Sequence, residues 1–195
     1  MCNILFLGPD KPPQNSIINF LLNDGSLVKR YGGELDIENI KKYKYNYLIS
    51  FGYRYIIGDE IIKYFKENAL NLHISYLPWN RGSDPNLWSI LENTPKGITI
   101  HQIEREIDKG KIFFQEKVFF DIDDTLKTAY NKLMNKIVNL FISNWHNIKS
   151  KNVIPFKQKG TGSFHKLSDK NDYINLLGKG WDTKIKELEG KAINV

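Results

Sequence analysis

The chain has 195 residues, of which 41% are hydrophobic, 13% aromatic and 26% charged, and this composition predicts one soluble globular domain rather than a disordered tail. No apolar run reaches the roughly 18–20 residues that a membrane helix needs, and no signal peptide is recognised, so we expect a cytoplasmic protein. The single cysteine, Cys2, cannot form an internal disulfide or hold a metal ion alone. Secreted disulfide scaffolds and cysteine-ligated zinc modules are therefore excluded.

The net charge of +6 is dominated by lysine, because only Arg30, Arg54, Arg81 and Arg105 are arginine among the 28 basic residues. Arginine is the side chain suited to bidentate contacts with bases and phosphates. The lysines are also spread along the chain, which is typical of a solvated surface. We therefore expect no nucleic-acid partner, and the positive charge is consistent with an anionic small substrate such as a nucleotide or a folate.

Strands and helices alternate over the first two-thirds of the chain. The apolar patterns predict strands at 3–7, 47–51, 71–75, 97–103 and 117–120, and helices around 17–22, at 59–65, from Asp84-Pro85 onward and at 124–147. The last helix is the clearest element, since its apolar residues recur every three or four positions and Asp123 or Asp124 can cap its start.

This alternation predicts an α/β fold with a doubly wound, mainly parallel, Rossmann-like sheet, whose ligands bind outside the carboxyl ends of the strands. Residues 1–150 are expected to form the catalytic domain. Residues 151–195 form a short C-terminal extension of a turn or hairpin and short helices, which is too small to fold as an independent domain.

Candidate catalytic groups gather between residues 71 and 110. Asn71 and His73 lie two positions apart on a predicted strand, so their side chains point the same way. An amide can stabilise an oxyanion, and an imidazole can move a proton near neutral pH. Asp108, which follows the strand that carries His101, could orient the His73 ring and favour its protonated form.

Several other kinds of site are not indicated by the sequence. The Gly8-Pro9 turn lacks the glycine spacing of a dinucleotide site, and no serine lies in a nucleophile elbow. The four histidines, His73, His101, His146 and His165, are not at metal-ligand spacing, so no metal is expected.

The run Asn71-x-His73-x-Ser75-x-Leu77-Pro78, followed by Arg81-Gly82, resembles the central motif of the folate-dependent formyltransferases. The resemblance continues from Gly97 to Ile112 and covers roughly residues 1–140. It implies direct transfer of a formyl group from N10-formyltetrahydrofolate, as co-substrate, to a primary amine, with Asn71, His73 and Asp108 as the catalytic residues and no metal.

The same resemblance implies the other site residues. The segment 48–57 is similar to the strand and loop that hold the folate pterin in this family, and the segment 79–89 looks most like the branch that acts on nucleotide-linked amino sugars. The implied cofactor-binding residues are Phe51, Tyr53, Arg54, Tyr55, Ile56, Ile57 and Gly110, and the implied substrate-binding residues are Trp79, Arg81 and Trp88.

The predicted function is therefore a sugar N-formyltransferase acting on a nucleotide-linked amino-dideoxysugar, with dTDP as the expected nucleotide and surface lipopolysaccharide biosynthesis as the setting. A homodimer is expected by analogy with the family. Three alternatives stay open: a formyltransferase on glycinamide ribonucleotide, one on methionyl-tRNA, and a non-catalytic nucleotide-sugar-binding module. Proline in the turn after the first strand disfavours glycinamide ribonucleotide, because proline has no N–H to offer a phosphate. The short C-terminal tail disfavours methionyl-tRNA.

Overall fold

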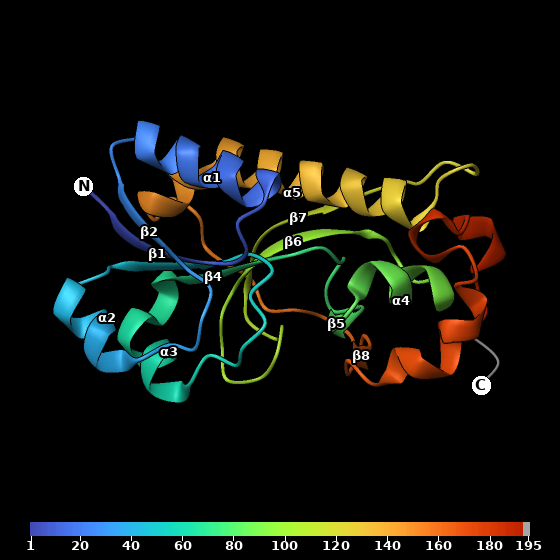
Figure 1. The fold of residues 1–195 in the computed structure, drawn as a ribbon. Coiled ribbons are helices and arrows are strands. Elements are labelled where there is room, and N and C mark those ends of the chain that lie inside the picture. The colour runs from blue at the N-terminus through green and yellow to red at the C-terminus, as the bar shows by residue number, and fades with distance from the viewer. Residues whose placement is uncertain (193–195) are drawn as a thin grey trace.

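The computed structural model describes residues 1–192 and is built around a six-stranded sheet with the strand order β2-β1-β3-β4-β6-β7 (Figure 1). Its strands are β1 (Asn3–Leu7), β2 (Leu27–Tyr31), β3 (Tyr47–Ser50), β4 (Ala69–His73), β6 (Gly97–Gln102) and β7 (Ile112–Lys117). The first four run parallel, whereas β6 and β7 are antiparallel to their neighbours. The predicted α/β fold with a mainly parallel sheet is confirmed.

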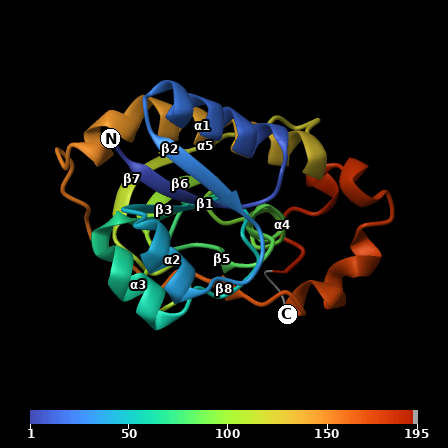
Figure 2. The same cartoon turned by 60° about the vertical axis from the view of Figure 1, so that its left-hand side comes forward.

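Helices cover both faces of the sheet (Figures 1 and 2). On one face lie α1 (Pro12–Asn23) and α5 (Leu126–Lys149), and on the other lie α2 (Ile37–Tyr43) and α3 (Asp59–Phe65). Each layer has its own core, because the strands between them are buried on both sides. The sheet is thus a rigid support whose strand ends can carry a site.

The long helix α5 begins two residues later than predicted. Thr125 is its N-cap, and the side chains and backbones of Thr125 and Thr128 form a reciprocal capping box. Asp124 instead accepts hydrogen bonds from the Thr128 hydroxyl and from the backbone N–H of Asp121. The prediction that Asp123 or Asp124 caps this helix is therefore wrong, because Thr125 is the residue whose hydroxyl accepts the hydrogen bond from the backbone N–H of Thr128 in the first turn.

Other elements differ from the prediction in position. β2 and α2 were not predicted, β4 begins two residues before the predicted strand, and β7 precedes the strand expected at 117–120. The β2 strand alternates exposed and intermediate residues at one edge of the sheet, so it lacks the apolar run that marked β1 and β3. Edge strands with one polar face give weak sequence signals.

The short helix η1 (Lys66–Asn68) lies between α3 and the start of β4. The remaining elements lie beside the other end of the sheet. They are β5 (Arg81–Gly82), α4 (Pro85–Leu91), β8 (Phe164–His165), η2 (Asp169–Leu176), η3 (Gly180–Asp182) and η4 (Ile185–Glu187). β5 and β8 pair in parallel, although about 80 residues separate them in the sequence. Ile185 and Leu188 pack with α4 and the start of α5 in a third core cluster. The C-terminal segment is thus packed onto the rest of the chain.

Trp145 on α5 joins the helix layer to the sheet. Its side chain is fully buried, contacts Tyr47 edge-on at 5.1 Å between ring centroids, and donates a hydrogen bond to Asp24. We expect Trp145→Ala to lower the free energy of unfolding by about 3–5 kcal/mol, because the change leaves a large cavity. Urea denaturation measures this, and the half-exposed Trp181 serves as the control, with a loss of at most about 1.5 kcal/mol. Equal losses at both positions would contradict the assignment of Trp145 to the core.

None of the helices in residues 1–192 combines the length and the apolar character that a membrane crossing would require.

Candidate active site

Asn71, His73 and Asp108 converge beyond the carboxyl end of β4. The Asn71 amide nitrogen donates to Asp108 Oδ1 at 3.1 Å, and His73 Nδ1 lies 3.7 Å from Asp108 Oδ2. Asn71 and His73 share one face of β4, and the loop after β6 brings Asp108 to them. An amide, an imidazole and a carboxylate in contact can stabilise an oxyanion and move a proton.

The His73 ring is held in one orientation. Its Nε2 lies 3.0 Å from the Asn80 carbonyl oxygen, which only accepts, so Nε2 carries a proton and Nδ1 faces Asp108. His73 is 7% exposed, and this burial lowers its pKa, although the charge of Asp108 partly opposes the shift. His73 is therefore neutral near pH 7 and presents a lone pair on Nδ1.

Asp108 has a left-handed backbone, with φ of 52°, which aspartate tolerates better than most residues. Two residues later, Gly110 lies so close to the Gln102 carbonyl that a Cβ atom would come within 1.8 Å of its oxygen. This contact fixes the turn against β6. Burial alone would raise the pKa of Asp108, but His73, His101 and the N–H of Gly82 hold that pKa well below its usual range. Asp108 is therefore ionised.

His101 also belongs to this cluster, although it was not among the predicted site residues. Its Nε2 lies 3.3 Å from Asp108 Oδ1 and 3.2 Å from the Asn71 amide nitrogen. Its Nδ1 donates to the Gln102 carbonyl. The antiparallel register pairs Asn71 with His101 across β4 and β6, and this pairing was not predicted. His101 thus helps to hold both Asn71 and Asp108.

The predicted folate-side residues fall into two groups. Phe51 is buried in the core, so only its backbone can reach a ligand, and its carbonyl accepts a hydrogen bond from Gln14. The loop that follows exposes Arg54, Tyr55 and Ile56, with Ile56 79% exposed. Tyr53 and Ile57 pack against the buried cluster that contains Ile103, at the start of the loop leading to Asp108. Their role in holding a folate stays a prediction.

The predicted substrate-side residues differ in exposure. Trp79 is partly exposed on the loop after His73. Arg81 donates to the backbone carbonyls of Thr161 and Ser163, so its guanidinium ties two segments together.

Trp88 is 3% exposed and stacks on His165 at 3.8 Å between centroids. Its ring therefore packs in the α4 cluster, and its contact with substrate stays a prediction. The stacking partner lies 77 positions away, so local pattern could not reveal it.

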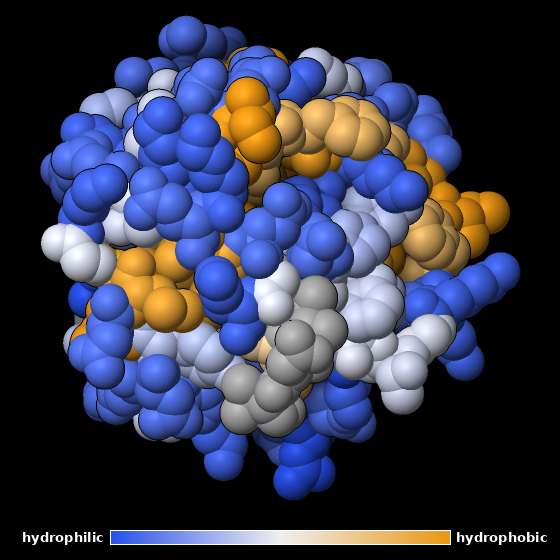
Figure 3. All heavy atoms as spheres, turned by 90° about the vertical axis from the view of Figure 1, so that its right-hand side faces the viewer, coloured by the Kyte–Doolittle hydropathy of each residue, from blue (hydrophilic) through white to orange (hydrophobic). Residues whose placement is uncertain are grey.

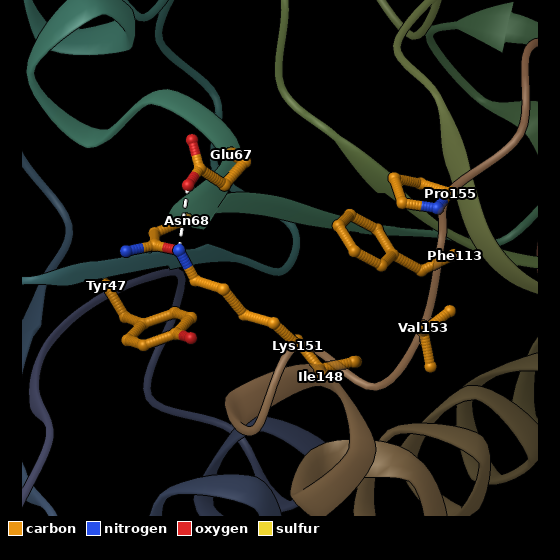
Figure 4. A pocket seen from close by; sticks show the side chains of 8 residues that line it. All are labelled: Tyr47, Glu67, Asn68, Phe113, Ile148, Lys151, Val153 and Pro155. Carbon is orange, nitrogen blue, oxygen red and sulfur yellow. Dashed lines mark hydrogen bonds and ion pairs between the residues drawn. The ribbon is translucent and has the colours of Figure 1, made fainter.

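A pocket of about 120 Å³ lies at the other end of the sheet (Figure 4). Tyr47 and Asn68 line it where β3 and β4 begin, and an ion pair between Lys151 and Glu67 crosses its wall. Small-molecule sites measure roughly 300–1,000 Å³, so this pocket is too small for a folate. The catalytic cluster, and not this pocket, is the candidate active site.

Within residues 1–192, no group of three or more histidine, cysteine, aspartate or glutamate side chains is placed to hold a metal ion.

A family model described as "Formyl transferase" matches residues 7–144 of the chain. The bifunctional polymyxin resistance protein ArnA of Wigglesworthia glossinidia brevipalpis is 31% identical over 147 residues, which is 71% of this chain. The match spans only 22% of the length of that relative.

Two solved structures extend the comparison. The formyltransferase PseJ from Anoxybacillus kamchatkensis, in complex with UDP-4,6-dideoxy-4-formamido-L-AltNAc and tetrahydrofolate, is 44% identical with a TM-score of 0.93, and the match covers 97% of this chain and 99% of that one. A likely sugar N-formyltransferase from Mycobacterium tuberculosis is 22% identical with a TM-score of 0.77 over 88% of this chain and 78% of that one, which shows a shared fold. Since the family model covers most of the chain, this protein is an enzyme of the formyl transferase family.

Proposed function

We propose that this chain transfers the formyl group of N10-formyltetrahydrofolate to the primary amine of a nucleotide-linked amino-dideoxysugar. The observation that carries the proposal is the similarity to PseJ, which extends over nearly the whole length of both chains at 44% identity. The cluster of Asn71, His73 and Asp108 supports it, since acyl transfer needs an oxyanion donor and a proton carrier side by side.

The substrate nucleotide is proposed to be UDP, and the amine to be at carbon 4 of the sugar. PseJ was crystallised with a UDP-linked 4-formamido sugar. The dTDP-linked sugar expected from the sequence alone occurs with a Helicobacter canadensis N-formyltransferase that is only 20% identical. A sequence identity of 20% supports a shared fold but does not indicate which nucleotide the substrate carries. The UDP-linked sugar is therefore the first candidate substrate.

The proposed chemistry begins with attack of the neutral amine on the formyl carbon. The new C–N bond forms while the formyl oxygen gains negative charge, and the Asn71 amide donates to that oxyanion. The Asn71 amide nitrogen donates to Asp108 Oδ1 at 3.1 Å and to His101 Nε2 at 3.2 Å, so one of these N–H groups must turn to the oxyanion when substrate binds. Holding both reactants in one cleft removes much of the entropic barrier.

His73 is proposed to carry the proton of the attacking amine. Its Nδ1 is unprotonated in the resting enzyme and accepts the proton as the new bond forms, and the ionised Asp108 stabilises the imidazolium. The proton then passes to N10 of the folate as the C–N10 bond breaks. The amine loses one hydrogen and gains a formyl group, and tetrahydrofolate leaves with that hydrogen.

The exposed loop after β3 is proposed to hold the folate. Tyr55 and Ile56 offer exposed apolar surface, and the exposed Arg54 can pair with a carboxylate of the glutamate tail. The backbone of Phe51 and the turn at Gly110 complete the proposed site. Trp79, which is partly exposed after His73, remains the proposed aromatic contact on the amine side.

Glycinamide ribonucleotide is a poorer candidate substrate because of the turn after β1. In this turn Asp10 lies just before α1 and pairs with Arg30, whose Nη1 lies 2.7 Å from Asp10 Oδ1. An ionised carboxylate at a helix start repels a phosphate, and Pro12 and Pro13 offer no N–H donors. This turn favours an amine substrate whose phosphates lie elsewhere.

The proposal is tested by incubating the protein with N10-formyltetrahydrofolate and a panel of amines. The panel contains UDP- and dTDP-linked amino-dideoxysugars with the amine at carbon 3 or 4, glycinamide ribonucleotide and initiator methionyl-tRNA. We expect a formamide product, identified by mass spectrometry, from the UDP-linked 4-amino sugar. Turnover of glycinamide ribonucleotide or tRNA alone would overturn the proposal. Binding of the sugar without transfer would favour a non-catalytic module.

A cytoplasmic location, a role in surface polysaccharide synthesis, and a catalytic domain at 1–150 with an extension at 151–195 remain predictions. A homodimer is proposed through the face shown in Figure 3, where apolar groups lie between polar ones. Phe119, Ile122 and Trp181 are exposed before and beside the start of α5 and could form such a contact. Light scattering of the purified protein gives the mass, and a monomer would contradict the homodimer.

A further inference from the structure

Residues 156–165 lie outside the region matched by the family model, which ends at residue 144, yet they run along both loops that shape the catalytic cluster. One loop, 76–83, follows β4, and the other, 104–111, follows β6. We call residues 156–165 the C-terminal strap. Its contacts with the two loops are made through the side chains of Gln158 and Ser163 and through backbone groups.

The strap holds the turn that carries Asp108. Gln158 Nε2 donates to the carbonyl oxygen of Asp108 at 2.7 Å and to that of Gly110 at 2.9 Å. Phe156 and Ile112 exchange backbone hydrogen bonds of 2.8 and 3.0 Å just beyond this turn. Because Asp108 has a left-handed backbone, these bonds oppose its relaxation to a commoner conformation.

The strap also holds the loop that contacts His73. Ser163 Oγ accepts from the backbone N–H of Asn80 at 3.0 Å, and the carbonyl of Asn80 in turn accepts from His73 Nε2. Gly162 packs so closely on the Pro78 carbonyl that a Cβ atom would lie 1.9 Å from its oxygen. Asn80 is fully buried with φ of 57°, so its carbonyl direction is set by these contacts.

A third contact joins the two loops. The backbone N–H of Gly82 donates to Asp108 Oδ2 at 2.8 Å, and Gly82 lies on β5, which pairs with β8 of the strap. The neighbouring N–H of Ser83 donates to the His165 carbonyl at 2.9 Å. The strap therefore supports three parts of the site: the turn that carries Asp108, the Gly82 N–H that donates to the Asp108 carboxylate, and the Asn80 carbonyl that orients His73.

We propose that the C-terminal strap is a positioning element of the active site, in which Gln158 and Ser163 fix the separation between the Asp108 carboxylate and the His73 ring. The expected effect on kcat rests on the proposed function. The expected effect on the separation of His73 and Asp108 does not, because it can be measured by NMR without substrate. A misplacement of about 1 Å at a catalytic group can cost a hundredfold in rate.

The test compares Gln158→Leu with Lys159→Leu, a matched change at the exposed neighbouring residue. In the intact protein, ¹⁵N NMR of the histidine rings gives the tautomer and titration midpoint of His73, which faces Asp108 and His101. Loss of both Gln158 hydrogen bonds lets the carboxylate move away from Nδ1. We expect the His73 midpoint to fall in Gln158→Leu and to stay at the wild-type value in Lys159→Leu.

Kinetics on the amine that the wild type uses supply the second measurement. We expect Gln158→Leu to lower kcat about tenfold to a hundredfold with a smaller change in KM for the nucleotide sugar, and Lys159→Leu to leave both unchanged. If Gln158→Leu does not fold, Ser163→Ala tests the same element through Asn80, with the same expected fall in kcat and a loss of the fixed Nε2–H tautomer.

A folded variant whose His73 midpoint and tautomer match the wild type, and whose kcat stays within about twofold, would overturn the proposal. Failure of the wild type to formylate any amine would count against the proposed function instead, and the NMR titration would still decide the role of the strap.

Discussion

His73→Gln is expected to lower kcat about 10²–10⁴-fold, the usual contribution of a positioned proton carrier. The glutamine amide can still donate to the Asn80 carbonyl in place of Nε2, so the loop after β4 keeps its main contact. No titratable atom remains at the position of Nδ1, however, and the proton of the amine loses its route to the folate nitrogen.

Steady-state and single-turnover kinetics measure this loss, and calorimetry measures binding of the nucleotide sugar. We expect the sugar to bind the variant about as tightly as the wild type, because the removed function acts in the transition state. His146→Gln, at an exposed position on α5, is the matched control and should retain full activity. A His73→Gln rate within tenfold of the wild type would contradict the proposed role of His73.

The inner parallel strands β1 and β3 could be predicted because they are buried on both faces and read as continuous apolar runs, whereas the exposed edge strand β2 could not. The antiparallel half was harder, since β7 is a partly exposed edge strand. The strand that became β6 was predicted, but nothing in the sequence gives its register against β4, which places His101 opposite Asn71. The residue types of Asn71, His73 and Asp108 were informative because the chemistry needs those side chains.

The surroundings of the cluster could not be predicted, because they act through backbone atoms. The carbonyls of Asn80, Asp108 and Gly110 carry no signature in the sequence, and any residue could supply them. The surroundings of Trp88 could not be predicted either. A tryptophan beside a helix start fits either a ligand or a core, and its stacking on the distant His165 could not be predicted from the local pattern.

Asp108→Asn is expected to lower kcat about 10²-fold or more and to move the acid limb of its pH profile downward. Asparagine tolerates the left-handed backbone of this position and can still accept from the Gly82 N–H, so the turn should persist. The negative charge beside His73 Nδ1 disappears, and with it the stabilisation of the imidazolium.

The direction of the pH shift follows from the active form of His73. The proposed mechanism needs neutral His73, so activity falls as the pH drops through its pKa. Burial already lowers that pKa, and the charge of Asp108 raises it in part. Without this charge the pKa falls further, so the variant should retain its reduced kcat to a lower pH than the wild type. The pH dependence of kcat and NMR titration of His73 measure the shift, with Asp172→Asn on the exposed C-terminal segment as control. A kcat that falls as the pH rises through the His73 pKa would mean that the protonated ring is the active form, and the direction of proton transfer proposed for His73 would have to be reversed.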